Sequence, residues 1–188
     1  MIKPTLLLDQ DGPLAAFDDH TWVRYIEEGL ILDIEEPTQQ RFHWLSKHLP
    51  DPAHRRRARE MIITPGWFAS LPVTPGAPEG VAALEEAGVD IWVCTKPLEQ
   101  NPSCLNDKLG WVQHHFPSLE HKLITTPNKA MVHGDVLLDD AIKPEWLPVA
   151  TWKPLVFTRA WNQEGSDWAD LPHWDWDQPL DALLEMLR

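Results

Sequence analysis

Short, largely apolar runs recur along the chain and give way to polar residues at their ends. The runs cover residues 5–8, 89–94, 123–125, 136–138 and 155–157. Uninterrupted runs of this length are typical of strands that helices bury on both faces, as in a parallel sheet. We therefore expect a parallel sheet with a strand at each run.

Stretches with helical periodicity separate several of these runs. Residues 77–87 predict a helix that ends at Gly88, residues 106–116 a helix that ends before Pro117, and residues 179–187 a closing helix. Alternating strands and helices predict an α/β fold with a doubly wound, Rossmann-like parallel sheet. Ligands of such sheets bind at the carboxyl ends of the strands, where the polar residues after the apolar runs lie.

Residues 18–74 interrupt this alternation after the first expected strand. Helical periodicity within the interruption covers residues 22–29 and 38–63. A structureless loop of this length is uncommon in a compact domain. We expect residues 1–17 and 75–188 to form the α/β core and residues 18–74 to form a small helical cap inserted into it.

The formal net charge of −13 argues against a nucleic-acid polymer as ligand, because binding a phosphate backbone requires a basic surface. Small anions stay open as substrates, since a bound cation and nearby lysines can reverse the potential within one pocket. The sequence has no signal peptide and no apolar stretch of membrane length, so we expect a cytoplasmic protein without a membrane partner.

The distribution of Trp, Pro and Cys adds two expectations. Six of the eleven Trp and five of the eighteen Pro follow Lys143, which predicts a loop-rich C-terminal section held by aromatic packing. Cys94 and Cys104 lack the spacing of a zinc or redox pair, and Cys94 ends an apolar run as a buried small residue would.

Two carboxylates follow the first expected strand in the segment Asp9-Gln10-Asp11-Gly12. Residues at i and i+2 point the same way from a strand end, and glycine permits the chain to turn sharply afterwards. A calcium-binding loop requires Glu at its twelfth position, which here is His20, so that interpretation fails.

Asp139 and Asp140 follow a later expected strand and supply two further carboxylates. Four carboxylates at one sheet edge repel one another unless a cation neutralises them. Oxygen ligands without His or Cys favour a hard ion, so we expect Mg²⁺.

These motifs resemble the haloacid dehalogenase superfamily of phosphatases, and within it most closely the 5′(3′)-deoxyribonucleotidase family. The resemblance spans nearly the whole chain. The segments that carry it are Asp9-Gln10-Asp11-Gly12-Pro13-Leu14-Ala15, Pro65-Gly66-Trp67-Phe68, Pro75-Gly76-Ala77, Cys94-Thr95-Lys96-Pro97, Lys108-Leu109-Gly110-Trp111-Val112, Lys129, Leu137-Leu138-Asp139-Asp140, Phe157-Thr158 and Trp168-Ala169-Asp170.

The resemblance implies a role for each acidic residue. Asp9 would attack phosphorus and form an aspartyl-phosphate, and Asp11 would protonate the leaving oxygen and then help deprotonate water. Lys129 would place a positive charge beside the transferring group. Mg²⁺ would be held by Asp9, the main-chain carbonyl of Asp11 and Asp139, with Asp140 nearby.

Several substrate contacts are also implied. Thr95 would donate its hydroxyl to a phosphoryl oxygen, and Lys108 is a candidate supporting contact, although a solvated lysine is an equal alternative there. Lys96, a further candidate contact, stands where relatives tend to carry a small hydroxyl residue. Ala141 stands where an Arg is often found. Both departures touch the phosphate or sugar surroundings, so the reaction type is better defined than the substrate.

Three aromatic residues, Phe17, Trp67 and Phe68, take positions where the resemblance places a slot for a nucleobase, whose flat face suits aromatic partners. The alternative is that these rings form the core that joins the cap to the sheet. The sequence therefore predicts a phosphatase of nucleoside monophosphates. A phosphatase of sugar phosphates and a catalytically silent nucleotide-binding protein are the alternatives, and a homodimer is left open.

Overall fold

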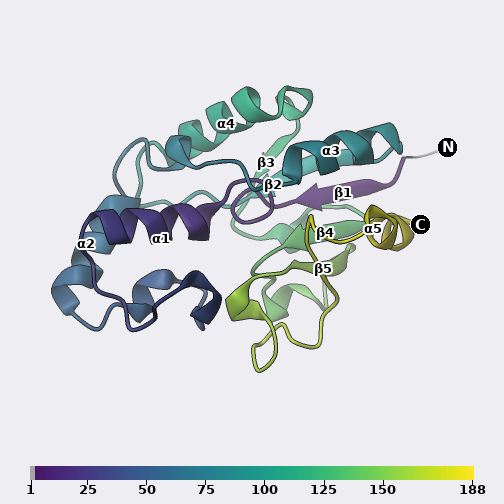
Figure 1. The fold of residues 1–188 in the computed structure, drawn as a ribbon. Helices are drawn as coiled ribbons and strands as arrows, with labels where there is room; N and C mark the ends of the chain where they lie inside the picture. Colours follow the sequence, from purple (N-terminus) through teal and green to yellow (C-terminus); the bar gives the residue numbers. More distant parts are fainter. Residues whose placement is uncertain (1–2) are drawn as a thin grey trace.

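A parallel sheet of six strands forms the centre of the protein in the computed structural model, which describes residues 3–188 (Figure 1). The strands are β1 (Thr5–Leu8), β2 (Asp90–Thr95), β3 (Leu123–Thr125), β4 (Val136–Asp139), β5 (Lys153–Phe157) and β6 (His173–Trp174). Their order is β3-β2-β1-β4-β5-β6, and all neighbours are parallel. The five expected strands are confirmed. β6 was not predicted, because a strand of two residues is too short to form a recognisable apolar run.

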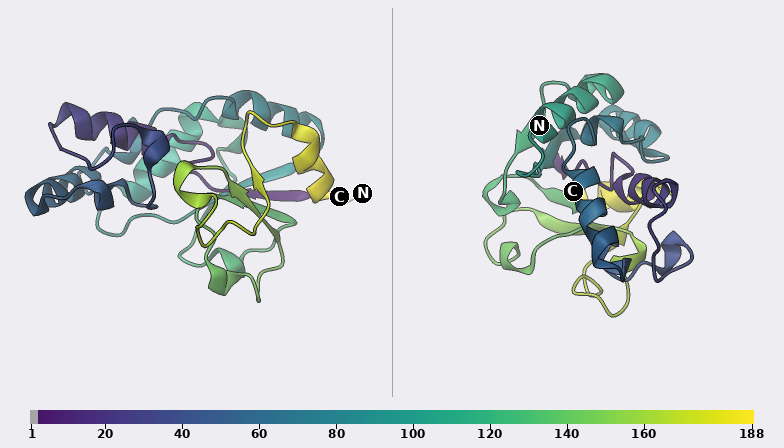
Figure 2. Two further views of the ribbon diagram at one scale, coloured as in Figure 1. Left: turned by 60° about the horizontal axis from the view of Figure 1, so that its bottom comes forward. Right: turned by 90° about the vertical axis from the view of Figure 1, so that its left-hand side faces the viewer.

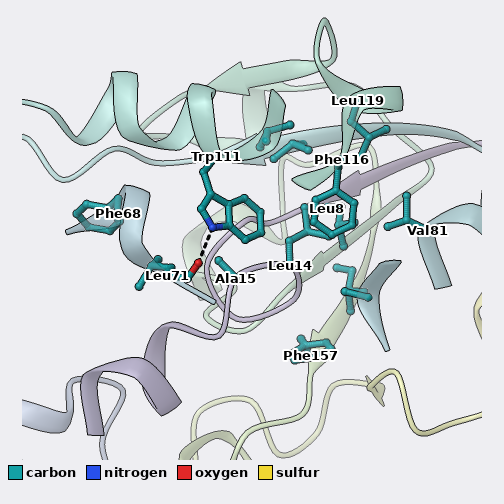
Figure 3. Packing of buried hydrophobic residues seen from close by; sticks show 14 of the residues in the cluster. Leu8, Leu14, Ala15, Phe68, Leu71, Val81, Trp111, Phe116, Leu119 and Phe157 are labelled. Carbon is teal, nitrogen blue, oxygen red and sulfur yellow. Dashed lines mark hydrogen bonds between the residues drawn. The ribbon is translucent and has the colours of Figure 1, made fainter. Parts of the chain in front are cut away.

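The α/β fold class is confirmed, and three helices cover one face of the sheet. They are α3 (Ala77–Glu86), α4 (Cys104–His115) and α5 (Leu180–Leu187), each within one or two residues of its expected bounds. Successive side chains of a strand point to opposite faces, so Leu6 and Leu8 pack with these helices while Leu7 does not. Figure 3 shows part of this cluster, including the indole N–H of Trp111, which donates to the carbonyl of Leu71 at 2.7 Å.

The opposite face of the sheet is covered by short turns and tryptophan side chains. Leu7 belongs there to a buried cluster with Trp146 and Trp152. The connections across this face run through the 3₁₀ turns Lys129–Met131 and Pro144–Trp146. The aromatic packing predicted for the C-terminal section is thus confirmed, and large indole rings take the place that helices usually fill.

The insert after β1 contains two helices joined by irregular chain. They are α1 (Phe17–Glu27) and α2 (Pro52–Ile62). The helical periodicity of residues 38–63 corresponds to separate elements, the 3₁₀ turns Pro37–Gln39 and Leu45–His48 and the helix α2, because Pro50 and Pro52 lack the N–H groups that a helix interior needs. Pro52 is instead the first residue of α2, and the carboxylate of Asp51 caps this helix by accepting the N–H of Ala53 at 2.7 Å.

The insert lies beyond the carboxyl end of β1, as Figures 1 and 2 show from three directions. Its buried residues Tyr25, Leu49 and Met61 belong to the same hydrophobic cluster as Leu6 and Leu8 of the sheet. The division of the chain into a core and a cap at residues 18 and 74 stays a prediction. Within residues 3–188, no helix combines the length and apolarity that crossing a membrane requires.

The strand order places the expected site at a crevice. β1 lies between β2 and β4, so the chain leaves the sheet in opposite directions at its two sides and opens a space above their carboxyl ends. Asp9 stands at this point, and its N–H donates to the carbonyl of Leu138 at 2.9 Å. Thr95 ends β2 and Asp139 ends β4 at the same edge.

Two helical glycines should respond oppositely to substitution. A Cβ at Gly80 would lie 2.2 Å from the ring of Trp176, whose indole N–H donates to the carbonyl of Pro13 at 2.7 Å. We expect Gly80→Ala to lower the free energy of unfolding by about 1–3 kcal/mol through overpacking. A Cβ at Gly110 of α4 meets nothing within 4 Å, so Gly110→Ala should raise the free energy of unfolding by about 0.5–1 kcal/mol. Urea unfolding measures the change in free energy for each variant. Changes of the same sign in the two variants would contradict this packing.

Candidate active site

Three buried carboxylates converge where β1 and β4 end. Each of Asp9, Asp139 and Asp140 offers an oxygen within 4.8 Å of the others. The N–H of Ala141 donates to Oδ1 of Asp139 at 2.9 Å and fixes the orientation of that carboxylate. An all-oxygen set of this kind suits a hard divalent cation such as Mg²⁺.

One buried lysine bridges two of these carboxylates. Nζ of Lys129 lies 2.6 Å from Oδ1 of Asp9 and 2.7 Å from Oδ2 of Asp139. The 3₁₀ turn that carries it is held by the indole N–H of Trp152, which donates to the carbonyl of Lys129 at 3.0 Å. Lys129 therefore places a positive charge between the expected nucleophile and an expected metal ligand.

Burial dominates the electrostatics of the cluster. It raises the pKa of Asp9 to about 6, against the lowering effect of Lys129, with Asp139 adding to the rise. Burial and the charges of Asp139 and Asp9 raise the pKa of Asp140 well above its usual value. Burial alone would lower the pKa of Lys129, but the two carboxylates it touches raise it. The carboxylates therefore carry more negative charge than Lys129 alone balances. A bound cation would supply the missing positive charge.

Asp11 lies beside the cluster but has a different partner. Nζ of Lys108 donates to its Oδ2 at 2.6 Å and to Oγ1 of Thr95 at 3.0 Å. Lys108 is fully buried, so it is not the solvated lysine that the sequence left as an alternative. Oδ1 of Asp11 is buried and has no protein hydrogen-bond partner among the described residues. The Asp11 carboxylate is thus outside the acidic cluster, and one of its oxygens is available for another group.

A cavity of about 370 Å³, called the central cavity below, opens in front of these residues. Phe17 and Phe68 line it with their ring planes 19° apart and their centroids 6.1 Å apart. The residues named in the sequence analysis that line the central cavity are Asp9, Asp11, Phe17, Phe68, Thr95, Lys96, Lys129, Asp139 and Asp140. One cavity thus joins the carboxylates to an aromatic surface.

Trp67 does not line the central cavity, unlike its neighbour Phe68. It lines a separate cavity of about 360 Å³ together with His20 and Arg24 of α1. Its ring meets that of His20 edge-on, with the centroids 5.0 Å apart. Neighbouring residues on a tight turn can point in different directions. Phe68 points to the central cavity, whereas Trp67 points to the separate cavity.

Three residues of the insert that the sequence did not single out also line the central cavity: Asp18, His43 and Trp44. Trp44 meets Phe17 edge-on with the centroids 6.3 Å apart, which extends the aromatic surface. The aromatic cluster from Phe42 to Trp44 was the available signal. Periodicity alone could not show which way these rings point, because that depends on their tertiary contacts.

The comparisons with known proteins agree with this geometry. Residues 3–178 match the model of the family described as "5′ nucleotidase, deoxy (Pyrimidine), cytosolic type C protein". A Bordetella pertussis protein provisionally assigned as a 5′(3′)-deoxyribonucleotidase is 31% identical, over 91% of this chain and 90% of its own. The human 5′(3′)-deoxyribonucleotidase, cytosolic type, is 29% identical over 84% and 81%. A haloacid dehalogenase-like hydrolase of Burkholderia xenovorans, also a provisional assignment, shares the fold with a TM-score of 0.57, 14% identity and full coverage of both chains.

The bridging lysine gives a prediction that needs no activity assay. Lys129→Met leaves two buried carboxylates without their counter-charge, and breaking a buried pair in this way costs about 3–5 kcal/mol. We expect that loss of unfolding free energy in chelator, and a larger stabilisation by added Mg²⁺ than in the parent, because a cation can then occupy a more negative site.

Lys122→Met is the matched control. Lys122 pairs with Asp90 at 2.8 Å near the surface, so its loss should cost at most about 1 kcal/mol and leave the Mg²⁺ response unchanged. Thermal unfolding of both variants with and without Mg²⁺ measures these shifts. Equal Mg²⁺ responses in the two variants would contradict a cation site beside Lys129.

Proposed function

Because the chain belongs to the 5′ nucleotidase, deoxy (pyrimidine), cytosolic type C protein family and is thus a phosphoric monoester hydrolase, we propose that it releases phosphate from deoxyribonucleoside monophosphates with the help of Mg²⁺. The observation that carries this proposal is the single cavity in which the carboxylates of Asp9 and Asp139 and the ammonium of Lys129 face Phe17 and Phe68. The name of the human relative supports a cytoplasmic location as a further part of the proposal.

The residues present fit a magnesium site. Asp9, Asp139 and Asp140 would hold the ion through carboxylate oxygens; burial first, and then the neighbouring carboxylates, raise the pKa values of Asp9 and Asp140. The main-chain carbonyl of Asp11 stays a proposed ligand. When bound, Mg²⁺ supplies positive charge that neutralises the carboxylates and the phosphoryl oxygens.

In the proposed first step, a carboxylate oxygen of Asp9 forms a bond to phosphorus while the bond between phosphorus and the ester oxygen breaks. The leaving oxygen takes a proton from Asp11 and departs as an alcohol. Lys108 holds Oδ2 of Asp11, so the unpartnered Oδ1 is the atom available for this transfer. The product of the step is an aspartyl-phosphate at Asp9.

In the second step, water attacks the phosphorus of the aspartyl-phosphate and gives a proton to Asp11. The bond to Asp9 breaks, which releases inorganic phosphate and restores both residues. Lys129 would stabilise the charge that shifts toward Asp9 and the phosphoryl oxygens. The hydroxyl of Thr95 would donate to a phosphoryl oxygen, and Lys96 at the wall of the cavity would add a positive charge near the phosphate or the sugar.

The aromatic part of the cavity supports a nucleotide over a sugar phosphate. Phe17, Phe68 and Trp44 contribute rings to one lining, and a nucleobase presents a flat face that such rings can contact. A sugar phosphate offers no comparable face. The slot proposed here therefore contains Trp44 in place of Trp67.

The activity is tested by phosphate release from a panel of deoxyribonucleotides, ribonucleotides and sugar phosphates. We expect release to be fastest with deoxyribonucleotides, to stop in excess chelator and to return with Mg²⁺. Asp9→Asn should show no turnover above background, because a carboxamide is a far poorer nucleophile.

Asp167→Asn is the control for this experiment, since Asp167 is exposed and distant in sequence from the acidic motifs. It should match the parent. Turnover by Asp9→Asn at a rate near the parent's would exclude the aspartyl-phosphate mechanism, and a preference for sugar phosphates would favour the other substrate class.

The nucleobase slot is tested by Trp44→Ala. The ring is 40% exposed, so its loss should leave the fold intact. We expect kcat/KM for deoxyribonucleotides to fall by about 1–3 kcal/mol in transition-state stabilisation, the usual worth of a base–aromatic contact. Hydrolysis of p-nitrophenyl phosphate should change much less. Trp67→Phe, which alters the other cavity, should leave the ratio of the two activities unchanged, and equal losses on both substrates in Trp44→Ala would argue against a slot.

A further inference from the structure

The insert side of the central cavity carries one carboxylate, that of Asp18 in the first turn of α1. Its neighbour in the chain, Phe17, contributes a ring to the aromatic slot in the same cavity. The indole N–H of Trp161 donates to Oδ2 of Asp18 at 2.9 Å, and this tryptophan is only 4% exposed. A buried donor from the connection between β5 and β6 thus fixes one oxygen of a carboxylate beside the slot.

The other oxygen of this carboxylate, Oδ1, has no hydrogen-bond donor and no ion-pair partner among residues 3–188. The second titratable side chain of the insert side, His43, is no counter-charge for it. The His43 ring stacks on that of Trp161 with the centroids 4.7 Å apart, and burial lowers its pKa, so the imidazole is neutral at neutral pH. Oδ1 of Asp18 is therefore an acceptor that the protein leaves open to a ligand of the cavity.

An open acceptor beside an aromatic slot is suited to the edge of a nucleobase, whose face the rings contact. A carboxylate accepts hydrogen bonds and donates none. Cytosine and adenine carry an amino donor where thymine and uracil carry a carbonyl, and a carbonyl oxygen facing a carboxylate leaves both acceptors unpaired. We propose that Asp18 contacts the base edge through Oδ1 and selects nucleotides whose base carries an exocyclic amino group. This inference rests on the proposed function and narrows its substrate class.

The bond from Trp161 gives one substitution a specific outcome. In Asp18→Asn the side chain keeps its size but has one accepting oxygen and one donating NH₂ group. Because the buried indole N–H requires an acceptor, the carboxamide oxygen should replace Oδ2 and the NH₂ group should replace Oδ1. The variant then donates where the parent accepts, so its preference should move from an amino group to a carbonyl.

The test measures kcat/KM for dCMP and dUMP in the presence of Mg²⁺, since these nucleotides carry an amino group and a carbonyl at the same ring carbon. In the parent we expect dCMP to be favoured by about tenfold or more. In Asp18→Asn we expect the preference to reverse in favour of dUMP. Because the readout is a ratio of two substrates, a general loss of activity or of folded protein cancels out of it.

Two further variants separate this role from a structural one. Asp19→Asn makes the same chemical change at the next residue, whose side chain is 58% exposed and does not line the cavity, so the ratio should stay that of the parent. Trp161→Phe keeps a ring but removes the N–H that orients the carboxylate, so the preference for dCMP should weaken without reversing.

The outcomes distinguish this inference from the function on which it rests. A parent that hydrolyses both nucleotides without preference or that favours dUMP, or an Asp18→Asn ratio equal to that of Asp19→Asn, would overturn the role of Asp18 and leave the proposed function intact. If Asp18→Asn did not fold, the ratios of the parent and of Trp161→Phe would still decide that role. A parent that hydrolyses p-nitrophenyl phosphate but neither nucleotide would overturn the proposed function, and the inference with it.

Discussion

The contact of Lys129 with both Asp9 and Asp139 is the interaction on which the rest of the site depends. Strands β1 and β4 are neighbours, so their terminal carboxylates come close together whatever the rest of the chain does. Buried carboxylates at that spacing repel one another, and a lysine between them makes the arrangement compatible with a folded protein. The indole of Trp152 holds the turn of this lysine, so the packing of the second sheet face also positions the ammonium group between the two carboxylates.

Charge balance extends beyond this one contact. Lys108 pairs with Asp11 and Lys129 with Asp9 and Asp139, while Lys96 and Lys143 also line the cavity. All four of these lysines lie outside the insert. The insert contributes mainly aromatic rings and one carboxylate to the same space. The sheet side is thus suited to a phosphate and the insert side to the remainder of a substrate.

Two signals in the sequence were predictive: the hydrophobic periodicity and the polar residues at the strand ends. Uninterrupted apolar runs located β1 to β5, and the polar residues after them located Asp9, Thr95 and Asp139 at one edge. It could not show that Trp67 and Phe68 face different cavities, because the direction of a side chain on a tight turn depends on its tertiary contacts. The burial of Lys108 was hidden for a similar reason: its partners, Asp11 and Thr95, are distant in the sequence.

The strand order also constrains when the enzyme becomes complete during synthesis. β1 is made first but lies in the middle of the sheet, and its backbone bonds to Asp135 across 130 residues of chain. Until β4 has emerged from the ribosome, the backbone N–H and C=O groups of β1 have no partner on that side and Asp9 lacks its neighbour Asp139. Such long-range pairing closes slowly and exposes an unpaired strand edge in the meantime. A nascent chain that stops short of β4 therefore carries Asp9 without Asp139, and its unpaired strand edge is open to wrong pairing with other chains.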